Sequence, residues 1–245
     1  MLYKFNSGGI FFEASFPQKS NGKTIIILPG LPEYPRPKKI MEDLSLKGYH
    51  VVYPRYSGTF ESDGLFLKRS PSEDVVFLLN ELRNDKLVEL YAKEKKKIPC
   101  NEVIIIAMSF GGSVALEIAK SDKFKDTKFI IGAPVLDFKT HGDIPGEQDL
   151  RNLKRFLLDG FPNIYRFEER DFDNLLEGKV ISTAYDTKKF YGDITVFHGT
   201  NDEAISFDKV KDFSDSKGIK LLKLEGEVHL SIEKLVKFAE TNELL

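Results

Sequence analysis

The sequence lacks tryptophan altogether and has a single cysteine, Cys100, among its 245 residues. One cysteine excludes an intrachain disulfide and a zinc site made of several cysteines. Long hydrophobic runs are also missing: the longest, Ile25–Leu28 and Val103–Met108, are far shorter than the roughly 20 apolar residues that cross a bilayer. Charged Lys4 and Glu13 interrupt the amino terminus, which has no apolar stretch typical of a signal peptide. We therefore expect a cytoplasmic protein without a membrane span.

An excess of charge of either sign is absent too, because 36 lysines and arginines stand against 38 aspartates and glutamates. A domain that binds nucleic acid usually has a clear basic excess, so we expect no nucleic-acid partner. Hydrophobic residues make up 41% of the chain and charged residues 30%, which excludes a disordered or collagen-like chain. A chain of this length can bury a large core without disulfides.

Strand-like and helix-like segments alternate along most of the chain. A turn at Asn6–Gly9 predicts an initial β-hairpin. The segment Thr24–Leu28 is apolar throughout, as expected of a strand that helices cover on both faces, and Glu102–Met108 is strongly apolar as well. The predicted strands are Leu2–Phe5, Ile10–Phe16, Thr24–Leu28, His50–Tyr53, Glu102–Met108, Lys128–Ile131, Asp193–His198 and Ile219–Leu224. This order predicts an α/β fold with an eight-stranded, mostly parallel sheet flanked by helices.

The predicted helices lie between these strands. Ser70 can cap a helix that starts at Pro71, and Glu73 can complete a capping box. The other predicted helices are Arg36–Lys47, Phe110–Lys120, Phe207–Ser214 and a last one that contains Leu230–Phe238. The lysine-rich residues 93–97 are expected to be a solvated helix end and loop. Residues 136–191 interrupt the alternation and are rich in aromatic and aliphatic side chains, so we expect a small helical cap insertion within a single domain of residues 1–245.

One segment between an apolar strand and a helix carries the strongest chemical signal. Residues Ala107–Gly112, with the sequence AMSFGG, follow the nucleophile-elbow pattern of small-x-Ser-x-Gly, with alanine where glycine is usual. A sharp turn pushes Ser109 outward and needs small residues two positions before and after it. The helix start places the Phe110 N–H and the positive end of the helix dipole beside the serine oxygen. The alternative interpretation is a strand–turn–helix with an incidental serine.

A second signal follows the first parallel strand, at Pro29–Leu31. The glycine in this turn lets the backbone direct the Leu31 N–H toward the same point as the Phe110 N–H. Two such donors would form an oxyanion hole, in which each donor stabilises the transition state by roughly 3–4 kcal/mol. A Pro-Gly turn that ends a strand in any fold is the alternative.

Two later loops at the carboxyl edge of the predicted sheet carry Asp202 and His229. Of the four histidines, His50 opens a strand, His141 lies in the insertion and His198 ends a strand, so His229 is the candidate general base. One helix and one strand separate the two loops, which can place them side by side. Alternatively, Asp202 is a loop aspartate and His229 a helix-capping or surface histidine.

With these residues in place, the sequence resembles the α/β-hydrolases over nearly its whole length. The order of nucleophile, acid and base in that family corresponds to Ser109, Asp202 and His229. The turn with Leu31 matches the oxyanion loop of the family, although Pro29 replaces the histidine that is common there. The insertion corresponds to the family's cap. Asp137 occupies an acid position that some members use, so the resemblance leaves it as an alternative to Asp202.

The resemblance implies a serine hydrolase that cleaves an ester-like acyl bond through an acyl-enzyme on Ser109. It needs no metal or organic cofactor. The aromatic insertion favours a small-molecule acyl substrate with a hydrophobic group, so the preferred interpretation is a carboxylesterase. The alternatives are a thioesterase or small peptidase with the same triad, or a non-catalytic binding protein with this fold.

Overall fold

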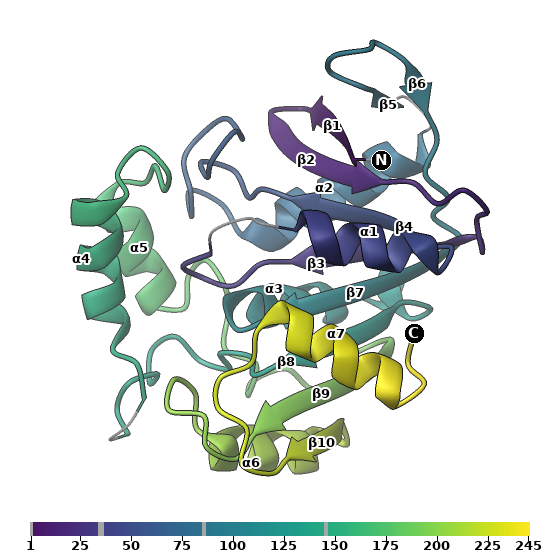
Figure 1. Cartoon of the computed structure of the whole chain (residues 1–245). Helices are drawn as coiled ribbons and strands as arrows, with labels where there is room; N and C mark the ends of the chain where they lie inside the picture. Colours follow the sequence, from purple (N-terminus) through teal and green to yellow (C-terminus); the bar gives the residue numbers. More distant parts are fainter. Residues whose placement is uncertain (1, 34–36, 85–86, 145–146) are drawn as a thin grey trace.

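The apolar segments of the sequence form one eight-stranded sheet in the order β1-β2-β4-β3-β7-β8-β9-β10 (Figure 1). This computed structural model describes residues 2–33, 37–84, 87–144 and 147–245. β1 and β2 form an antiparallel hairpin that pairs antiparallel with β4, and the remaining strands pair in parallel. The strands of this sheet are β1 (Leu2–Ser7), β2 (Ile10–Ser15), β3 (Lys23–Leu28), β4 (His50–Pro54), β7 (Glu102–Met108), β8 (Lys128–Gly132), β9 (Asp193–Gly199) and β10 (Lys220–Leu224). The predicted fold class is confirmed.

Helices cover both faces of this sheet. In Figure 1, α1 and α7 lie in front of the strands, with α2 and α3 behind them. The helices are α1 (Lys38–Leu46), α2 (Pro71–Arg83), α3 (Phe110–Ala119), α4 (Leu150–Gly160), α5 (Glu169–Leu176), α6 (Phe207–Lys217) and α7 (Ile232–Thr241), with a short 3₁₀ turn at Asp122–Phe124. The helix predicted from Arg36 is present from Lys38 on, and Arg36 lies outside the described residues. No helix in the described ranges has the length and hydropathy needed to cross a membrane.

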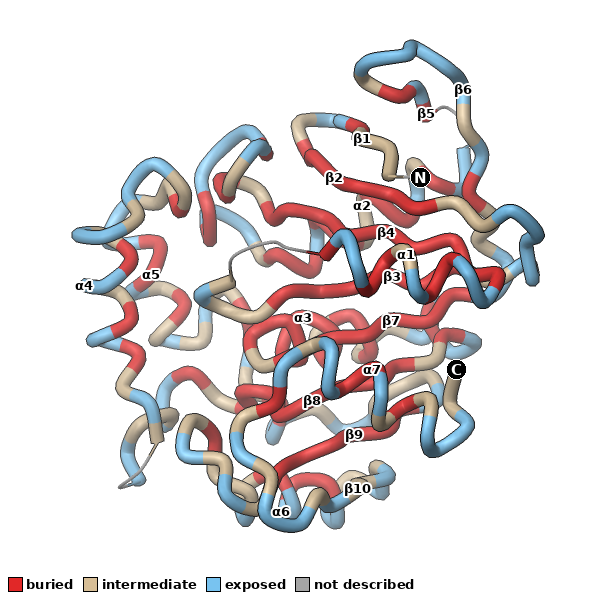
Figure 2. Tube along the Cα trace, viewed as in Figure 1, coloured by how far each residue is buried: buried red, intermediate tan, exposed pale blue. Residues whose placement is uncertain are grey.

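The central strands are buried beyond their first residues because helices lie on both sides of them (Figure 2). Ile25–Leu28 of β3 and Ile105–Ala107 of β7 have no exposed surface. This burial explains why these stretches are apolar at consecutive positions instead of alternating with polar residues. The predicted capping box also forms, because the Ser70 side chain accepts the Ser72 N–H and the Glu73 side chain accepts the Ser70 N–H.

The lysine-rich stretch differs from the sequence-based expectation. Instead of a helix end and loop, it contributes β6 (Lys95–Lys96), which pairs antiparallel with β5 (Leu87–Val88) in a separate two-stranded sheet. The strands are too short for an alternating pattern to be visible in the sequence. In Figure 1 this hairpin projects from the end of the molecule that carries β1 and β2.

The insertion at residues 136–191 contains α4 and α5, which stand beyond the end of the sheet toward which β9 points (Figure 1). The chain between these helices is attached to the loop that follows β4. Tyr165 forms an isolated β-bridge with Thr59, and the Arg166 N–H donates to the Gly58 carbonyl at 2.8 Å. The insertion is therefore fixed to the body of the protein between its two helices.

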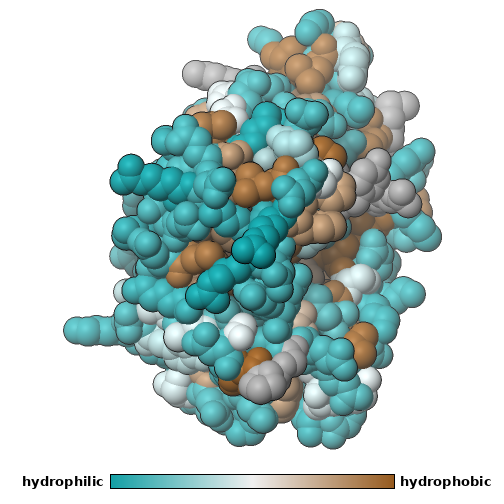
Figure 3. All heavy atoms as spheres, turned by 90° about the vertical axis from the view of Figure 1, so that its left-hand side faces the viewer, coloured by the Kyte–Doolittle hydropathy of each residue, from teal (hydrophilic) through white to brown (hydrophobic). Residues whose placement is uncertain are grey.

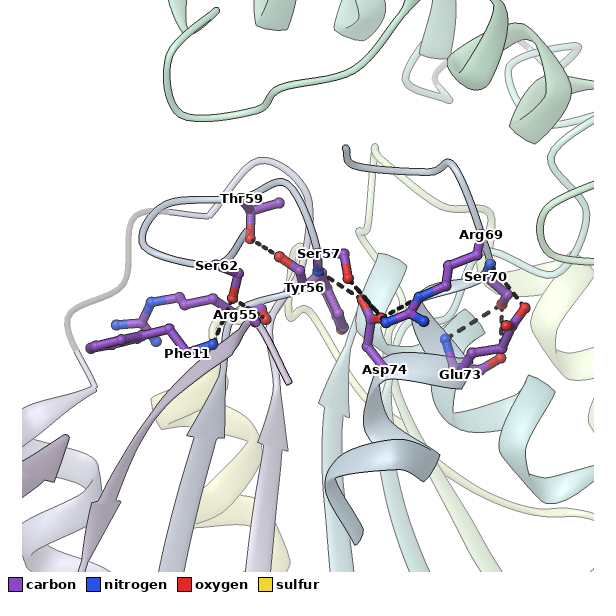
Figure 4. A network of polar contacts seen from close by, with 12 residues as sticks. Phe11, Arg55, Tyr56, Ser57, Thr59, Ser62, Arg69, Ser70, Glu73 and Asp74 are labelled. Carbon is purple, nitrogen blue, oxygen red and sulfur yellow. Dashed lines mark hydrogen bonds and ion pairs between the residues drawn. The ribbon is translucent and has the colours of Figure 1, made fainter. Parts of the chain in front are cut away.

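The loop after β4 is itself held by a polar network (Figure 4). The Asp74 carboxylate, in the first turn of α2, accepts the Ser57 N–H at 2.7 Å, the Ser57 hydroxyl at 2.8 Å and the Arg69 Nε–H at 2.8 Å. The Ser62 hydroxyl accepts the Phe11 N–H of β2 at 2.9 Å. These bonds fix the two ends of the loop to α2 and its middle to β2.

Candidate functional site

Ser109 lies in the turn between β7 and α3 with a backbone conformation that L-residues rarely adopt, φ 54° and ψ −116°. Such a conformation costs a non-glycine residue about 1–3 kcal/mol and occurs mainly at functional sites. The neighbouring Gly111 allows the tight turn, because a Cβ atom there would lie 2.4 Å from the Leu28 carbonyl oxygen. The elbow predicted from the sequence therefore has the strained geometry that its small residues suggest.

The loop predicted to supply an oxyanion donor, residues Pro29–Glu33 and called the oxyanion loop below, lies beside this serine. Leu28 and Ala107 are register partners in β3 and β7, so the residues that follow them leave the sheet together. A Cβ atom on Gly30 would lie 3.6 Å from that of Ser109. Neither the Leu31 N–H nor the Phe110 N–H is used in a hydrogen bond within the part of the chain that the structure describes. Both predicted donors are thus free to bind an oxyanion near Ser109.

Asp202 and His229 are in direct contact. The His229 Nδ1 atom lies 2.8 Å from the Asp202 Oδ2 atom, with 32% of the histidine side chain exposed and none of the aspartate side chain. The alternative acid, Asp137, instead accepts the Lys139 N–H and the Thr140 hydroxyl within its own turn. The geometry pairs His229 with Asp202.

Backbone packing between two loops produces this pair. The Asn201 N–H donates to the Glu227 carbonyl at 2.9 Å, and the Gly226 N–H donates to the Thr200 hydroxyl at 2.8 Å. A Cβ atom on Gly199 would lie 2.2 Å from the Glu227 carbonyl oxygen, so only glycine permits this approach. The loops after β9 and β10 are thereby held side by side.

Burial and hydrogen bonds act in opposite directions on Asp202. Burial raises the pKa of this carboxyl, but the hydrogen bond with His229 and the Ile205 N–H lower it by more, so that the net shift is downward. Asp202 is therefore ionised at neutral pH and favours the His229 tautomer with a proton on Nδ1. The His198 ring is fully buried beside this pair, 3.7 Å from the Asp202 Oδ2 atom, and contacts the Ile205 carbonyl at 3.0 Å through Nε2. His198 thus has a packing role, as its place at a strand end suggests.

A pocket extends from Ser109 to Ala204 and Ile205, and neither Asp202 nor His229 lines it. We call it the Ser109 pocket; its polar members are Ser109, His141 and Gln148, and its other lining residues are Leu31, Phe110, Val135, Phe138, Leu150, Leu153, Phe172, Leu175, Ala204 and Ile205. The Asp202 Oδ1 atom accepts the N–H groups of Ala204 and Ile205, at 2.8 and 3.0 Å, so Asp202 lies behind one wall of the pocket. No hydrogen bond joins Ser109 to His229 in this structure, although both residues are described.

The Ser109 pocket is nearly filled by its own side chains. It leaves about 20 Å³ in which the centre of a water molecule can move, enough for one or two waters. The surface over α4 and α5 is largely hydrophilic, with separate apolar areas and a hollow between them (Figure 3). A group larger than this fits the pocket only if lining side chains move aside.

Two residues at the oxyanion loop, Glu33 within it and Tyr165 in contact with it, have no sequence pattern that predicts a place in the site. The Tyr165 hydroxyl accepts the Glu33 N–H and donates to the Glu33 carbonyl, both at 2.9 Å. Burial raises the pKa of Tyr165 to about 12, so it remains a neutral hydroxyl that can do both. The insertion thereby holds the oxyanion loop through a side chain that lies 132 positions away in the sequence.

Glu33 and Tyr165 also line a small second pocket with Tyr53, Arg55 and their neighbours. Burial raises the pKa of Glu33, and the negative charge of Glu233 adds to this effect, while the Gly30 N–H and Arg55 oppose it. The Arg55 side chain is 4% exposed and pairs with Glu13 at 2.7 Å.

A larger hollow, about 620 Å³, lies elsewhere. It is formed at the amino ends of β3, β7 and β8 by residues that include Lys23, Glu102 and Lys128, far from the strand ends that carry Ser109. Among residues 2–33, 37–84, 87–144 and 147–245, no three His, Cys, Asp or Glu side chains are grouped as a metal site.

Comparisons with known proteins identify the fold. No protein-family model matches the chain, and no curated protein matches its sequence. Solved structures match over nearly the full length. Est1E from Butyrivibrio proteoclasticus with bound ferulic acid has a TM-score of 0.65 and 18% identity, covering 98% of this chain and 97% of its own. DcsB in complex with its substrate analogue has a TM-score of 0.69 and 14% identity, covering 100% and 97%.

An α/β serine hydrolase homologue from Coxiella burnetii has a TM-score of 0.60 and 14% identity, and the alignment covers 100% of this chain and 97% of that one. These likenesses agree with the strand order and with the two antiparallel strands at one edge of the sheet. The chain has the α/β-hydrolase fold. The fold supports many activities, so the activity has to be inferred from the site.

Proposed function

We propose that the protein is a serine hydrolase that cleaves an ester-like acyl bond through an acyl-enzyme. Ser109 is the nucleophile, His229 the general base and Asp202 the group that orients the imidazole. The observation that carries this proposal is the 2.8 Å contact between His229 and Asp202 beside the pocket that contains Ser109. A strained serine at a strand–helix turn and a fully buried aspartate paired with a histidine are both costly to keep in a protein that only binds.

The reaction proceeds in two halves. His229 Nε2 accepts the proton of the Ser109 hydroxyl as the oxygen attacks the acyl carbon, and Asp202 stabilises the imidazolium that forms. The N–H groups of Leu31 and Phe110 bind the oxyanion. His229 then protonates the leaving alcohol. Water, deprotonated by His229, attacks the acyl-enzyme and releases the acid and free Ser109.

The missing hydrogen bond between Ser109 and His229 fits a resting site. Catalytic hydrogen bonds are often long or poorly aligned before substrate binds. His229 is partly exposed in the loop before α7, whereas Asp202 is fully buried, so the imidazole can reorient while the carboxylate stays in place.

The lining of the Ser109 pocket supports a carboxylesterase that acts on a small hydrophobic acyl group. Ten of its thirteen residues are apolar, and they come from the oxyanion loop, α3 and residues 135–205. We propose that residues 136–191 form a cap that closes this pocket. Since the pocket has little free volume, the cap helices have to shift for each turnover.

A fluorophosphonate probe and a panel of chromogenic esters test this proposal. Wild-type protein should be labelled on Ser109 and should hydrolyse short-chain esters faster than thioesters or amides. Ser109→Ala should abolish labelling. Lack of labelling of folded wild-type protein would count for a non-catalytic binding protein, and preference for thioesters or amides would replace the carboxylesterase assignment.

The choice of acid has a matched test in two aspartates. Asp202→Asn should lower kcat by about 10⁴-fold, because the imidazole then loses the partner that fixes its tautomer. Asp137→Asn should leave kcat within a few-fold of wild type, since its carboxylate bonds within its own turn. The opposite result would move the acid to Asp137.

A further inference from the structure

His141 is a polar residue in a pocket that is otherwise almost entirely apolar. It comes from the insertion, its side chain is 5% exposed, and it lines the Ser109 pocket. It also lines an adjoining space together with Glu147 and Lys209. His141 thus stands between the site of the proposed chemistry and a buried charged pair. An imidazole in such a place calls for a partner, because an unpaired buried polar group destabilises a protein by about 1–3 kcal/mol.

Glu147 determines which nitrogen of the His141 imidazole can accept a hydrogen bond. Its carboxylate, with a side chain 3% exposed, accepts the Gly142 N–H at 3.0 Å, the Ser206 N–H at 3.3 Å and the Lys209 ammonium at 2.8 Å. Burial raises the pKa of Glu147, but these donors lower it by more. The carboxylate is therefore ionised, and its Oε2 atom lies 3.9 Å from the His141 Nδ1 atom.

A negative charge on that side favours the tautomer with the proton on Nδ1. Burial lowers the pKa of His141, and the charge of Lys209 adds to this effect, while Glu147 and Asp202 oppose it. The ring is therefore neutral at pH 7, and Nε2 carries a lone pair. Within the described residues, Nε2 has no hydrogen-bond partner.

The position of His229 indicates which part of the substrate reaches His141. His229 has to protonate the leaving alcohol, so the alcohol lies next to it. His229 is not among the residues that line the Ser109 pocket, whereas both oxyanion donors are. The pocket therefore takes the acyl side of the substrate.

We propose that His141 is a specificity residue whose Nε2 atom accepts a hydrogen bond from a hydroxyl on the acyl group. This rests on the serine-hydrolase function proposed above and narrows its substrates to esters of hydroxy-substituted acids. An unsubstituted acyl group would bury the imidazole without a partner. The loss is that of one hydrogen bond between neutral groups, so we expect a preference of about 10- to 100-fold in kcat/KM.

The test compares triplets of chromogenic esters whose acyl groups differ only in one substituent: hydrogen, hydroxyl or methoxyl. Straight-chain acids with a 3-hydroxyl place the hydroxyl close to the acyl carbon, and phenylpropanoic acids with a ring hydroxyl place it farther away. Each enzymatic rate is divided by the rate of alkaline hydrolysis of the same ester to remove inductive effects. Wild-type protein should prefer the hydroxyl over both other substituents in at least one triplet. A methoxyl oxygen accepts hydrogen bonds but does not donate, so it should not substitute.

Variants of His141 locate the preference. His141→Phe keeps a ring but removes the acceptor, and should reduce the hydroxyl preference to about 1 while still hydrolysing the unsubstituted ester. His141→Gln keeps an acceptor and should retain part of the hydroxyl preference. This second variant also tests the proposal if His141→Phe does not fold. Phe138→Leu, a neighbour in the same pocket, should change the rates of all three esters in the same proportion.

The outcomes separate the two proposals. Wild-type hydrolysis without a hydroxyl preference in any triplet, or an unchanged preference in both His141 variants, overturns the role of His141 and leaves the hydrolase standing. No hydrolysis and no fluorophosphonate labelling overturns both.

Discussion

Asp202 combines complete burial with ionisation, and this makes its contribution to stability depend on pH. Its two oxygens accept two backbone N–H groups and contact His229. The folded-state pKa of Asp202 lies below the ordinary value of 3.8. The unfolded chain therefore binds more protons than the folded one at pH values between the two pKa values. The stabilising contribution of the carboxylate is present above pH 3.8 and is lost as the pH falls through the folded-state pKa.

Asp202→Asn removes this titration. We expect the variant to have a lower free energy of unfolding than wild type at pH 7, by about 1–3 kcal/mol, because an amide replaces a hydrogen-bonded charge. The difference should shrink as the pH is lowered below 3.8. Urea unfolding of both proteins in steps from pH 7 to pH 3 measures it. A difference that stays constant or widens on acidification would contradict the downward shift.

Sequence patterns predicted those residues of the candidate site that follow strands. Ser109 stands in a recognisable turn, and Asp202 and His229 lie one strand and one helix apart in loops at the same sheet edge. Glu33 and His141 had no such signal. Their environment comes from residues far away in the sequence, such as Tyr165 for Glu33 and Lys209 for the carboxylate beside His141.

The element that sets the geometry of the site is the N-terminus of α3. It approaches the end of β3 so closely that a Cβ atom on Gly111 would lie 2.4 Å from the Leu28 carbonyl oxygen and 2.5 Å from the Pro29 carbonyl oxygen. These atoms belong to backbone and cannot turn aside as a flexible side chain can. Any side chain at position 111 therefore has to push the helix away from the strand.

Gly111→Ala should lower the free energy of unfolding by about 1–3 kcal/mol or more. The displaced helix carries the Phe110 N–H away from the Leu31 N–H, so fluorophosphonate labelling of the folded variant should also slow markedly. Gly160→Ala is the matched control, because Gly160 ends α4 and no atom lies within 4 Å of a Cβ placed there. This variant should be as stable as wild type or slightly more stable. Equal effects of the two substitutions would refute the packing argument.

Elements with a strong pattern were predictable and those formed by pairing alone were not. The buried strands, such as Glu102–Met108, have bounds that follow the apolar run, because the side chains from Val103 on are buried under helices. The hairpin of β5 and β6 consists of two-residue strands, one of them Lys95–Lys96, which have no periodicity to detect. Its formation depends on pairing between the two strands and not on composition.

At the scale of the whole molecule, three segments far apart in the sequence meet over the carboxyl edge of the sheet. They are the oxyanion loop, the loop after β4 and the chain between α4 and α5. Tyr165 joins all three, because its backbone bridges Thr59, its hydroxyl holds the backbone of Glu33 and its ring packs edge-on against Phe60 at 5.6 Å. The sequence predicted a helical insertion over this edge, but it gave no means to predict which residue attaches it.

Tyr165→Phe removes the hydroxyl but keeps the ring and its packing. The Glu33 N–H and carbonyl both lose their partner, so the oxyanion loop with the Leu31 N–H should become less ordered. We expect kcat for a good ester substrate to fall by about 10-fold with little change in KM, because the oxyanion forms only in the transition state. The free energy of unfolding should fall by about 1–2 kcal/mol.

Tyr91→Phe is the control for the loss of a tyrosine hydroxyl, since Tyr91 is 74% exposed and lies near the β5–β6 hairpin. It should alter neither kcat nor stability. If Tyr165→Phe loses stability but keeps full kcat, the contact only fastens the insertion to the fold. If kcat falls while the free energy of unfolding stays near that of wild type, the insertion orders the oxyanion loop. In that case, the contact between Tyr165 and Glu33 has two roles. It orders the oxyanion loop, which carries the Leu31 N–H, and it attaches the proposed cap over the pocket.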